Sequence, residues 1–155
     1  ELGMNPDKIM EFVEENCSVE ANFLKTNGQS VQIKGFDFAP QLHTARGGVV
    51  SSEWTAQMAV SYKIMEDFYS KGADISKAVE YGNKAQMYLN ELGNMIISSS
   101  SPSGQGQGCL PYATQDNVDT GHGWMIPKGS HTGSVSATAY TLFAYYGFNP
   151  LELKE

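Results

Sequence analysis

Apolar side chains recur at helical spacing in four stretches of the chain, which predicts four helices. The first covers about residues 6–16 and begins at Asn5-Pro6, where a capping residue precedes proline at the first helical position. The others cover about residues 51–70, 74–97 and 134–146. Each of these three begins at Ser or Asp, and two of them end at glycine, which are ordinary signals for the two ends of a helix.

The predicted helices differ in how much of their surface is apolar. The stretch 74–97 carries one apolar stripe and a polar remainder, which is typical of a surface helix outside the core. The stretch 51–70 is apolar on more than one face, and no Asp, Glu, Lys or Arg occurs between Gly129 and Leu151. We therefore expect inner helices at 51–70 and 134–146, buried on nearly every side, and outer helices at 6–16 and 74–97.

A short internal repeat links the two inner helices. The pattern Ser-x-x-x-Thr-Ala, followed by Tyr, begins at Ser51 and again at Ser134, at a constant offset of 83 residues. The repeat predicts that the two inner helices pair with each other.

Two long polar segments precede the inner helices. Residues 18–50 contain turn formers and a short alternating run, Val31-Gln32-Ile33, that allows one strand of a small β-hairpin within a long structured loop. Residues 98–131 are rich in Ser, Gly, Gln and Pro, and a loop of this length in a compact domain is usually functional or disordered. Its second half contains Leu110, Trp124 and Ile126, so we expect that half to be held against the body of the protein.

The length and charge of the chain narrow its organisation and its partners. The 155 residues fit a single domain, 1–155. The net charge of −7 is spread along the chain, and the ten Lys and Arg form no stripe that could neutralise phosphates. No apolar run is long enough to span a membrane. We therefore expect neither nucleic acid nor a membrane as a partner. Cys17 and Cys109 can form one disulfide or remain two thiols.

Two segments carry a resemblance to a known superfamily. GVVSSEWTAQMAVSYKIM (48–65) and TGHGWMIPKGSHTGSVSATAYTLFAYYGFNPL (120–151) resemble the closing hairpins of bacterial carbohydrate-active proteins with an α/α toroid of the six-hairpin glycosidase type. The resemblance implies an all-α fold in which the four helices form an incomplete toroid, since a closed toroid needs many more. The chain is then a portion of a larger toroid or a self-associating unit.

The same resemblance implies where a sugar site would lie. In that superfamily the loops before the inner helices converge on the sugar, which places the site here on residues 35–52 and 108–134. Glycoside hydrolysis requires a carboxylic acid and an ionised carboxylate partner, and aromatic rings stack on sugars. The catalytic candidates are Asp37, Glu53, Asp116 and Asp119, and the candidate substrate contacts are His43, His122, Trp124 and Trp54.

Several of these candidates also have structural explanations. Glu53 lies in the first turn of a predicted helix, where the helix dipole favours a negative charge. Asp116 and Asp119 stand in ordinary turn sequences, and Trp54 lies on a helix packed on several sides. Asp116, Asp119 and His122 are spaced by three but do not lie on a predicted helix, so the spacing does not place them on one face. We expect no metal and no other cofactor.

Three functional hypotheses remain open at this stage. The first is a carbohydrate-active enzyme domain, a glycoside hydrolase or a protein similar to a polysaccharide lyase. The second is a non-enzymatic structural module that assembles with further copies of itself. The third is a sugar-binding module without turnover. The expected partners are carbohydrate and either a homo-oligomer or the remainder of a longer chain, and the resemblance favours an extracellular or periplasmic location.

Overall fold

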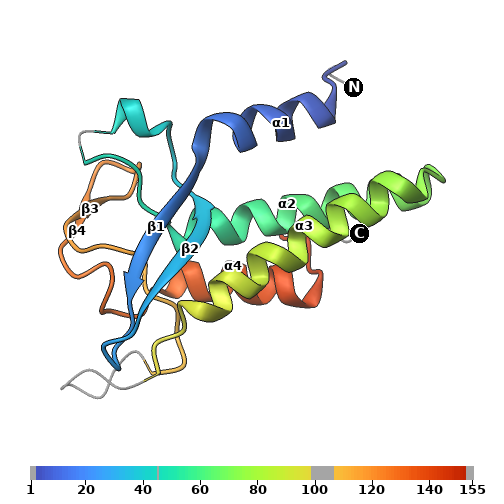
Figure 1. Ribbon diagram of the computed structural model, residues 1–155. Coiled ribbons are helices and arrows are strands. Elements are labelled where there is room, and N and C mark those ends of the chain that lie inside the picture. The colour runs from blue at the N-terminus through green and yellow to red at the C-terminus, as the bar shows by residue number, and fades with distance from the viewer. Residues whose placement is uncertain (1–2, 45, 99–106, 153–155) are drawn as a thin grey trace.

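The computed structural model describes residues 3–44, 46–98 and 107–152 of the chain. Four helices and two small antiparallel sheets follow one another along it (Figure 1). In chain order the elements are α1 (Pro6–Cys17), β1 (Ser18–Leu24), β2 (Ser30–Phe36), a 3-10 turn (Gln41–His43), α2 (Ser52–Lys71), α3 (Ile75–Asn94), β3 (Val118–Asp119), β4 (Met125–Ile126) and α4 (Val135–Tyr146).

The prediction of an all-α incomplete toroid is wrong, because the fold mixes helices with β-structure. The strands β1 and β2 pair along their whole length, from Ser18 opposite Phe36 to Leu24 opposite Ser30, and β3 pairs with β4. In β1, Val19 and Phe23 are buried while Glu20 is exposed, which is the two-residue period of a half-buried strand. This period is short and follows α1 directly, so the sequence pattern predicts a loop here and not a strand.

Helix α2 lies at the centre of the helical layer. It packs against α3 on one side and against α4 on the other, while α3 and α4 touch each other less. Figure 1 shows the β1–β2 hairpin crossing one end of this layer. Helix α1 lies on the opposite side of α2 from α4. The predicted helices are present, but they form a central layer with α1 and a hairpin against it, and not a set of inner and outer helices.

The core contains a row of tyrosines that joins α2 to α3. Tyr62 on α2 stacks on Tyr88 of α3, with ring centroids 5.7 Å apart and an interplanar angle of 4°. Tyr69 stacks in the same way on Tyr81, at 5.8 Å and 2°. Tyr62, Tyr81 and Tyr88 are all buried. The expectation that the helix at 74–97, which is α3, lies outside the core is therefore wrong, because Tyr81 and Tyr88 of α3 are part of the core.

Helix α4 corrects a second expectation about burial. Of its residues only Ala137 and Ala144 are buried, whereas Val135 and Tyr146 are largely exposed. The absence of charged residues from this stretch predicts burial on nearly every side. The structure instead buries Ala137 and Ala144 fully and Tyr140 and Phe143 in part, and leaves the opposite side of α4 exposed.

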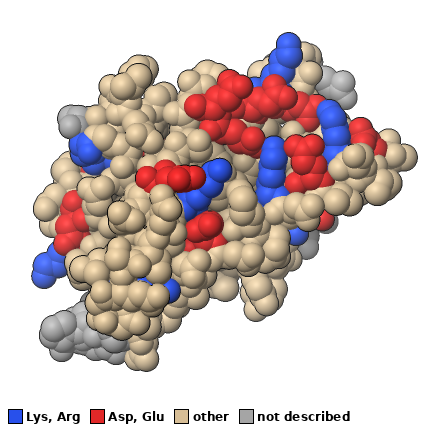
Figure 2. Space-filling view, in the orientation of Figure 1, with Lys and Arg blue, Asp and Glu red and all other residues tan. Residues whose placement is uncertain are grey.

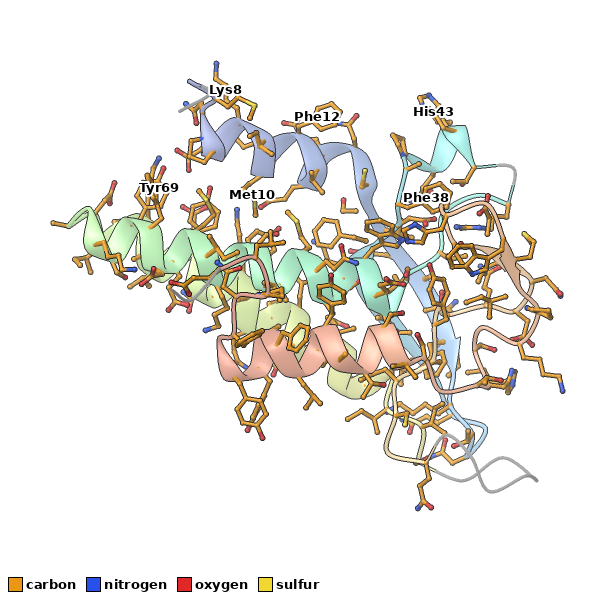
Figure 3. All side chains as sticks on the ribbon, turned by 180° about the vertical axis from the view of Figure 1, so that it is seen from behind. Lys8, Met10, Phe12, Phe38, His43 and Tyr69 are labelled. Carbon is orange, nitrogen blue, oxygen red and sulfur yellow. The ribbon has the colours of Figure 1, made fainter. Side chains whose placement is uncertain are left out.

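Helix α1 is attached to the helical layer by the apolar side chains of Met10 and Val13 and by several polar contacts. Met10 points from α1 toward α2, while Lys8 and Phe12 point away from it (Figure 3). The carboxylate of Asp7 accepts hydrogen bonds from Lys77, Tyr69 and Tyr81. The carboxylate of Glu14 accepts further hydrogen bonds from Lys84 and Tyr62. Figure 2 shows acidic side chains gathered over α1, with lysines between them.

Two further observations answer questions raised by the sequence. The thiols of Cys17 and Cys109 are both free, so the fold holds without a bridge between them. Among the described residues, no helix combines the length and the apolar character that crossing a bilayer requires.

Candidate functional site

The internal repeat positions the N-terminal ends of α2 and α4 in the same way. Ser51 caps α2, its backbone N–H donates to the carbonyl of the last residue of β2 at 3.0 Å, and Thr55 Oγ1 accepts that residue's N–H at 2.9 Å. The same pattern ties Leu110 to α4. The N–H of its cap, Ser134, donates to Leu110 O at 2.8 Å, and Thr138 Oγ1 accepts the Leu110 N–H at 3.2 Å. Each helix thus begins against an incoming extended segment.

A pocket of about 250 Å³ opens where these two helix ends meet the loop that carries β3 and β4. Its floor includes Glu53 from the first turn of α2 and Ser136 from the first turn of α4. Ser136 Oγ donates to Glu53 Oε2 at 3.0 Å, and Gln57 Nε2 donates to the other carboxylate oxygen at 3.4 Å. The lining residues are Glu53, Tyr112, Thr120, His122, Trp124, Ile126, Ser134 and Ser136.

Three aromatic rings form a continuous stack beside the pocket. His122 lies between Trp54 and Trp124, with ring centroids 5.4 Å from each and interplanar angles of 23° and 26°. Trp54 is half-buried, and its indole Nε1 donates to the carbonyl of Thr120 at 3.3 Å. Trp124, at the outer end of the stack, has an exposed fraction of 58%. The outer end of the stack is therefore open to solvent.

Buried polar groups hold in place the loop that carries His122 and Trp124. The Tyr112 hydroxyl donates to the Thr120 carbonyl at 3.2 Å, and Thr120 Oγ1 donates to the Trp124 carbonyl at 3.1 Å. Burial, together with the negative charge of Glu53, raises the pKa of Tyr112 to about 12. Tyr112 is therefore a neutral hydrogen-bond donor that fixes the loop, and it is not a proton acceptor at physiological pH.

Asp37 has a structural role away from this pocket. Its buried carboxylate forms a two-pronged ion pair with Arg46, at 2.7 and 3.0 Å, and also accepts the backbone N–H groups of Phe38 and Val49. The Arg46 guanidinium also donates a hydrogen bond to the carbonyl of Asp119 at 3.2 Å. Both Asp37 oxygens are thus occupied by bonds that fasten the loop after β2 to the β3–β4 loop.

Asp116 and Asp119 shape turns at the two ends of β3. Asp116 accepts the backbone N–H and hydroxyl of Ser130 at 3.0 and 2.9 Å, and His131 Nδ1 lies 3.2 Å from it. Burial raises the pKa of Asp116, but the hydrogen bonds from Ser130 and His131 outweigh it and the net shift is downward. Asp119 accepts the N–H of Gly121 at 2.9 Å, which is an ordinary turn contact.

The structure thus brings together part of the candidate set. Glu53, His122 and Trp124 line one pocket and Trp54 stacks behind it, while Asp37, Asp116 and Asp119 do not line it. His43 lies on the 3-10 turn and points away from the body of the protein (Figure 3). The loop 35–52 supplies none of the described lining residues, although Glu53 follows it directly.

Sequence reasoning did not name five of the lining residues as site candidates, which are Tyr112, Thr120, Ile126, Ser134 and Ser136. Ser136 could have been found from the repeat, because the offset of 83 residues that relates Ser51 to Ser134 also relates Glu53 to Ser136. Tyr112 has no comparable signal, since its position depends on the course of a long loop.

The chemistry available in the pocket is that of hydrogen bonding and stacking. Within the described part of the chain, no group of three or more His, Cys, Asp or Glu residues is placed to hold a metal ion. The pocket offers one carboxylate, serine hydroxyls and an open aromatic face. Comparison of the chain with protein-family models, with curated proteins and with solved structures gives no match.

Proposed function

We propose that this protein binds carbohydrate in the pocket between the N-terminal ends of α2 and α4. The observation that carries the proposal is that the exposed Trp124 ring and the Glu53 carboxylate line the same pocket. A sugar ring has an apolar C–H face that packs on an indole and hydroxyl groups that donate to a carboxylate. The pocket volume of about 250 Å³ lies just below the roughly 300 Å³ at which pockets for drug-sized ligands begin, and so favours a single ring.

Binding without turnover is the form of the proposal that the side chains favour. Hydrolysis of a glycosidic bond ordinarily uses two carboxyl groups that flank the bond. Of the described residues that line the pocket, Glu53 is the one carboxylate, and Asp37, Asp116 and Asp119 are each engaged elsewhere. Glu53 therefore acts in this proposal as a hydrogen-bond acceptor for sugar hydroxyls.

The resemblance noted in the sequence gives further support. The two segments that resemble carbohydrate-active proteins, 48–65 and 120–151, supply every described lining residue except Tyr112. The support concerns the ligand class and does not extend to the toroid fold.

The proposal is tested by titrating the protein with a panel of neutral and acidic oligosaccharides, using calorimetry and NMR. We expect one class of glycan to bind, and Trp124→Ala to weaken its Kd at least about tenfold, which corresponds to ~1.4 kcal/mol. Phe12→Ala is the matched control, because Phe12 is an aromatic residue with a similar exposed fraction, 61%, on α1. A panel without a binder, or equal affinity in Trp124→Ala, would refute the proposal.

An assay of sugar release on the same panel separates binding from catalysis. We expect no release of reducing ends by the wild-type protein. Release that Glu53→Gln abolishes would replace the binding proposal with a hydrolase, in which Glu53 is a catalytic group and the second carboxyl group comes from outside the described lining.

A further inference from the structure

The outer surface of α4 is apolar and open to solvent. Val135, Tyr145 and Tyr146 have exposed fractions of 87%, 69% and 75%, and Leu142 is 50% exposed. No Asp, Glu, Lys or Arg interrupts the sequence between Gly129 and Leu151. An exposed helical face normally carries charged residues, and large contiguous apolar patches on soluble proteins mark interaction sites.

This surface also contains a groove of about 360 Å³ between α3 and α4. Its apolar lining includes Leu89 and Leu92 from α3, Leu142 from α4, and Ile96, which follows α3. Its polar lining residues among those described are uncharged amides, threonines and tyrosines. The α4 face, which we define as the exposed side of α4 together with this groove, therefore combines projecting side chains with a hollow.

We propose that two copies of the chain associate through their α4 faces. A two-fold contact uses the same patch on both copies, so it requires a patch that is complementary to itself. The α4 face meets this requirement, because Tyr145 and Tyr146 project at the edge of the groove and both help to line it. In the dimer these tyrosines pack into the groove of the second copy. Tyrosines are enriched at such interfaces because the ring is buried while the hydroxyl reaches water.

The distribution of charge favours a second copy over this face. A net charge of −7 opposes association of the chain with itself wherever acidic surfaces would meet. Figure 2 shows one dense group of acidic side chains over α1, whose sequence includes Asp7, Glu11 and Glu14. No Asp or Glu is among the described residues that line the groove, so two α4 faces meet there without bringing like charges together. The contact would also supply the burial that the uncharged sequence of α4 indicates and that the single chain does not provide.

Sedimentation equilibrium of the whole chain tests the proposal directly. We expect the wild-type protein to be dimeric at about 100 μM and to dissociate on dilution. Tyr146→Asp places a charge within the contact and is expected to leave a folded monomer, because this residue is already 75% exposed in the single chain. Leu142→Asp, at a second position in the groove, should have the same effect.

Leu42→Asp is the matched control, since Leu42 is 95% exposed on the 3-10 turn and receives the same added charge. It should dimerise like the wild type, and circular dichroism should show the same helix content in all variants. A wild-type protein that remains monomeric at about 100 μM would overturn the proposal and assign the α4 face to a different partner. A Tyr146→Asp variant that dimerises like the wild type would also overturn it.

Discussion

Ser136 donates a hydrogen bond of 3.0 Å to Glu53, the residue that stands 83 positions before it and occupies the same place in the first turn of α2. Helices α2 and α4 repeat one local pattern. Each is capped by a serine, and in each a threonine hydroxyl accepts a hydrogen bond from the segment that precedes the helix in space. At this one pair of equivalent positions, a carboxylate and a hydroxyl meet. The pocket floor is thus built at the contact between the two halves of the repeat.

Removing the hydroxyl of Ser136 should loosen this contact. We expect Ser136→Ala to lower the free energy of unfolding by ~1 kcal/mol, the usual contribution of a hydrogen bond to a charged acceptor that is partly solvated. Urea denaturation measures the change. Ser76→Ala, at an exposed position in the first turn of α3, is the control and should change stability by less than about 0.5 kcal/mol. Equal effects in the two variants would contradict a specific contact.

The two threonines of the repeat should differ in their importance. Thr55 is fully buried, so Thr55→Val leaves the N–H of Phe36 buried without its acceptor and should cost about 1–3 kcal/mol of stability. Thr138 is half-buried, and water can replace its hydroxyl on the N–H of Leu110, so Thr138→Val should cost less.

Thr141→Val is the control for both substitutions, and urea denaturation is again the measurement. The Thr141 hydroxyl donates at 2.8 Å to the carbonyl of Ala137 within its own helix, and its loss leaves the helix backbone bonded. The expected order of destabilisation is Thr55→Val, then Thr138→Val, then Thr141→Val. A larger loss in Thr138→Val than in Thr55→Val would show that burial does not decide the effect.

Local sequence signals were sufficient to place the helices. Asn5, Ser51, Asp74 and Ser134 each cap a helix, and each side-chain oxygen accepts the backbone N–H three residues later. Such contacts span a few residues and depend little on the rest of the fold. The strand β1 lacked a comparable signal, because its alternation is short and α1 ends immediately before it.

The candidate site was harder to predict, because the role of a carboxylate depends on partners that are distant in sequence. Asp37 and Glu53 look alike in the sequence, yet Arg46 fills the oxygens of Asp37 while Glu53 faces a pocket. Helix α4 illustrates the same limit. Its uncharged sequence indicates an apolar environment, but sequence alone does not say whether the same chain provides it.

The close approach of β2 to α2 should make Gly35 intolerant of a side chain. A methyl group at this position would overlap the hydroxyl of Thr55 and the side chain of Val50, both of which are buried. We expect Gly35→Ala to cost about 1–3 kcal/mol, as overpacking of a core usually does. At Gly93, near the end of α3, a methyl group meets nothing within 4 Å. Gly93→Ala should therefore stabilise the protein by about 0.5–1 kcal/mol through its better helix propensity.

Thermal and urea denaturation of these two glycine variants give the test. The prediction requires shifts of opposite sign from the same chemical change. If Gly35→Ala unfolded at the wild-type urea concentration, β2 would lie farther from α2 in solution than in the structure.

The attachment of α1 should weaken in acid. Hydrogen bonds from Lys77 and Tyr69 lower the pKa of Asp7 from 3.8 to about 2 in the folded protein. A carboxylate whose pKa is lower in the folded state than in the unfolded state stabilises the fold above its unfolded pKa and loses that contribution as the pH falls. The contribution of Asp7 should thus be complete above about pH 4 and disappear between pH 3.8 and pH 2.

Urea unfolding midpoints measured between pH 6 and pH 2 test this window, with Asp7→Asn compared against the wild type. The asparagine cannot ionise, so its midpoint should fall less steeply than that of the wild type as the pH drops through the window. Asp67→Asn is the control, because Asp67 pairs with Lys71 at an exposed position and should leave the acid limb of the curve close to that of the wild type. Parallel curves for Asp7→Asn and the wild type would show that α1 is held by the packing of Met10 and its neighbours, without a contribution from the Asp7 charge.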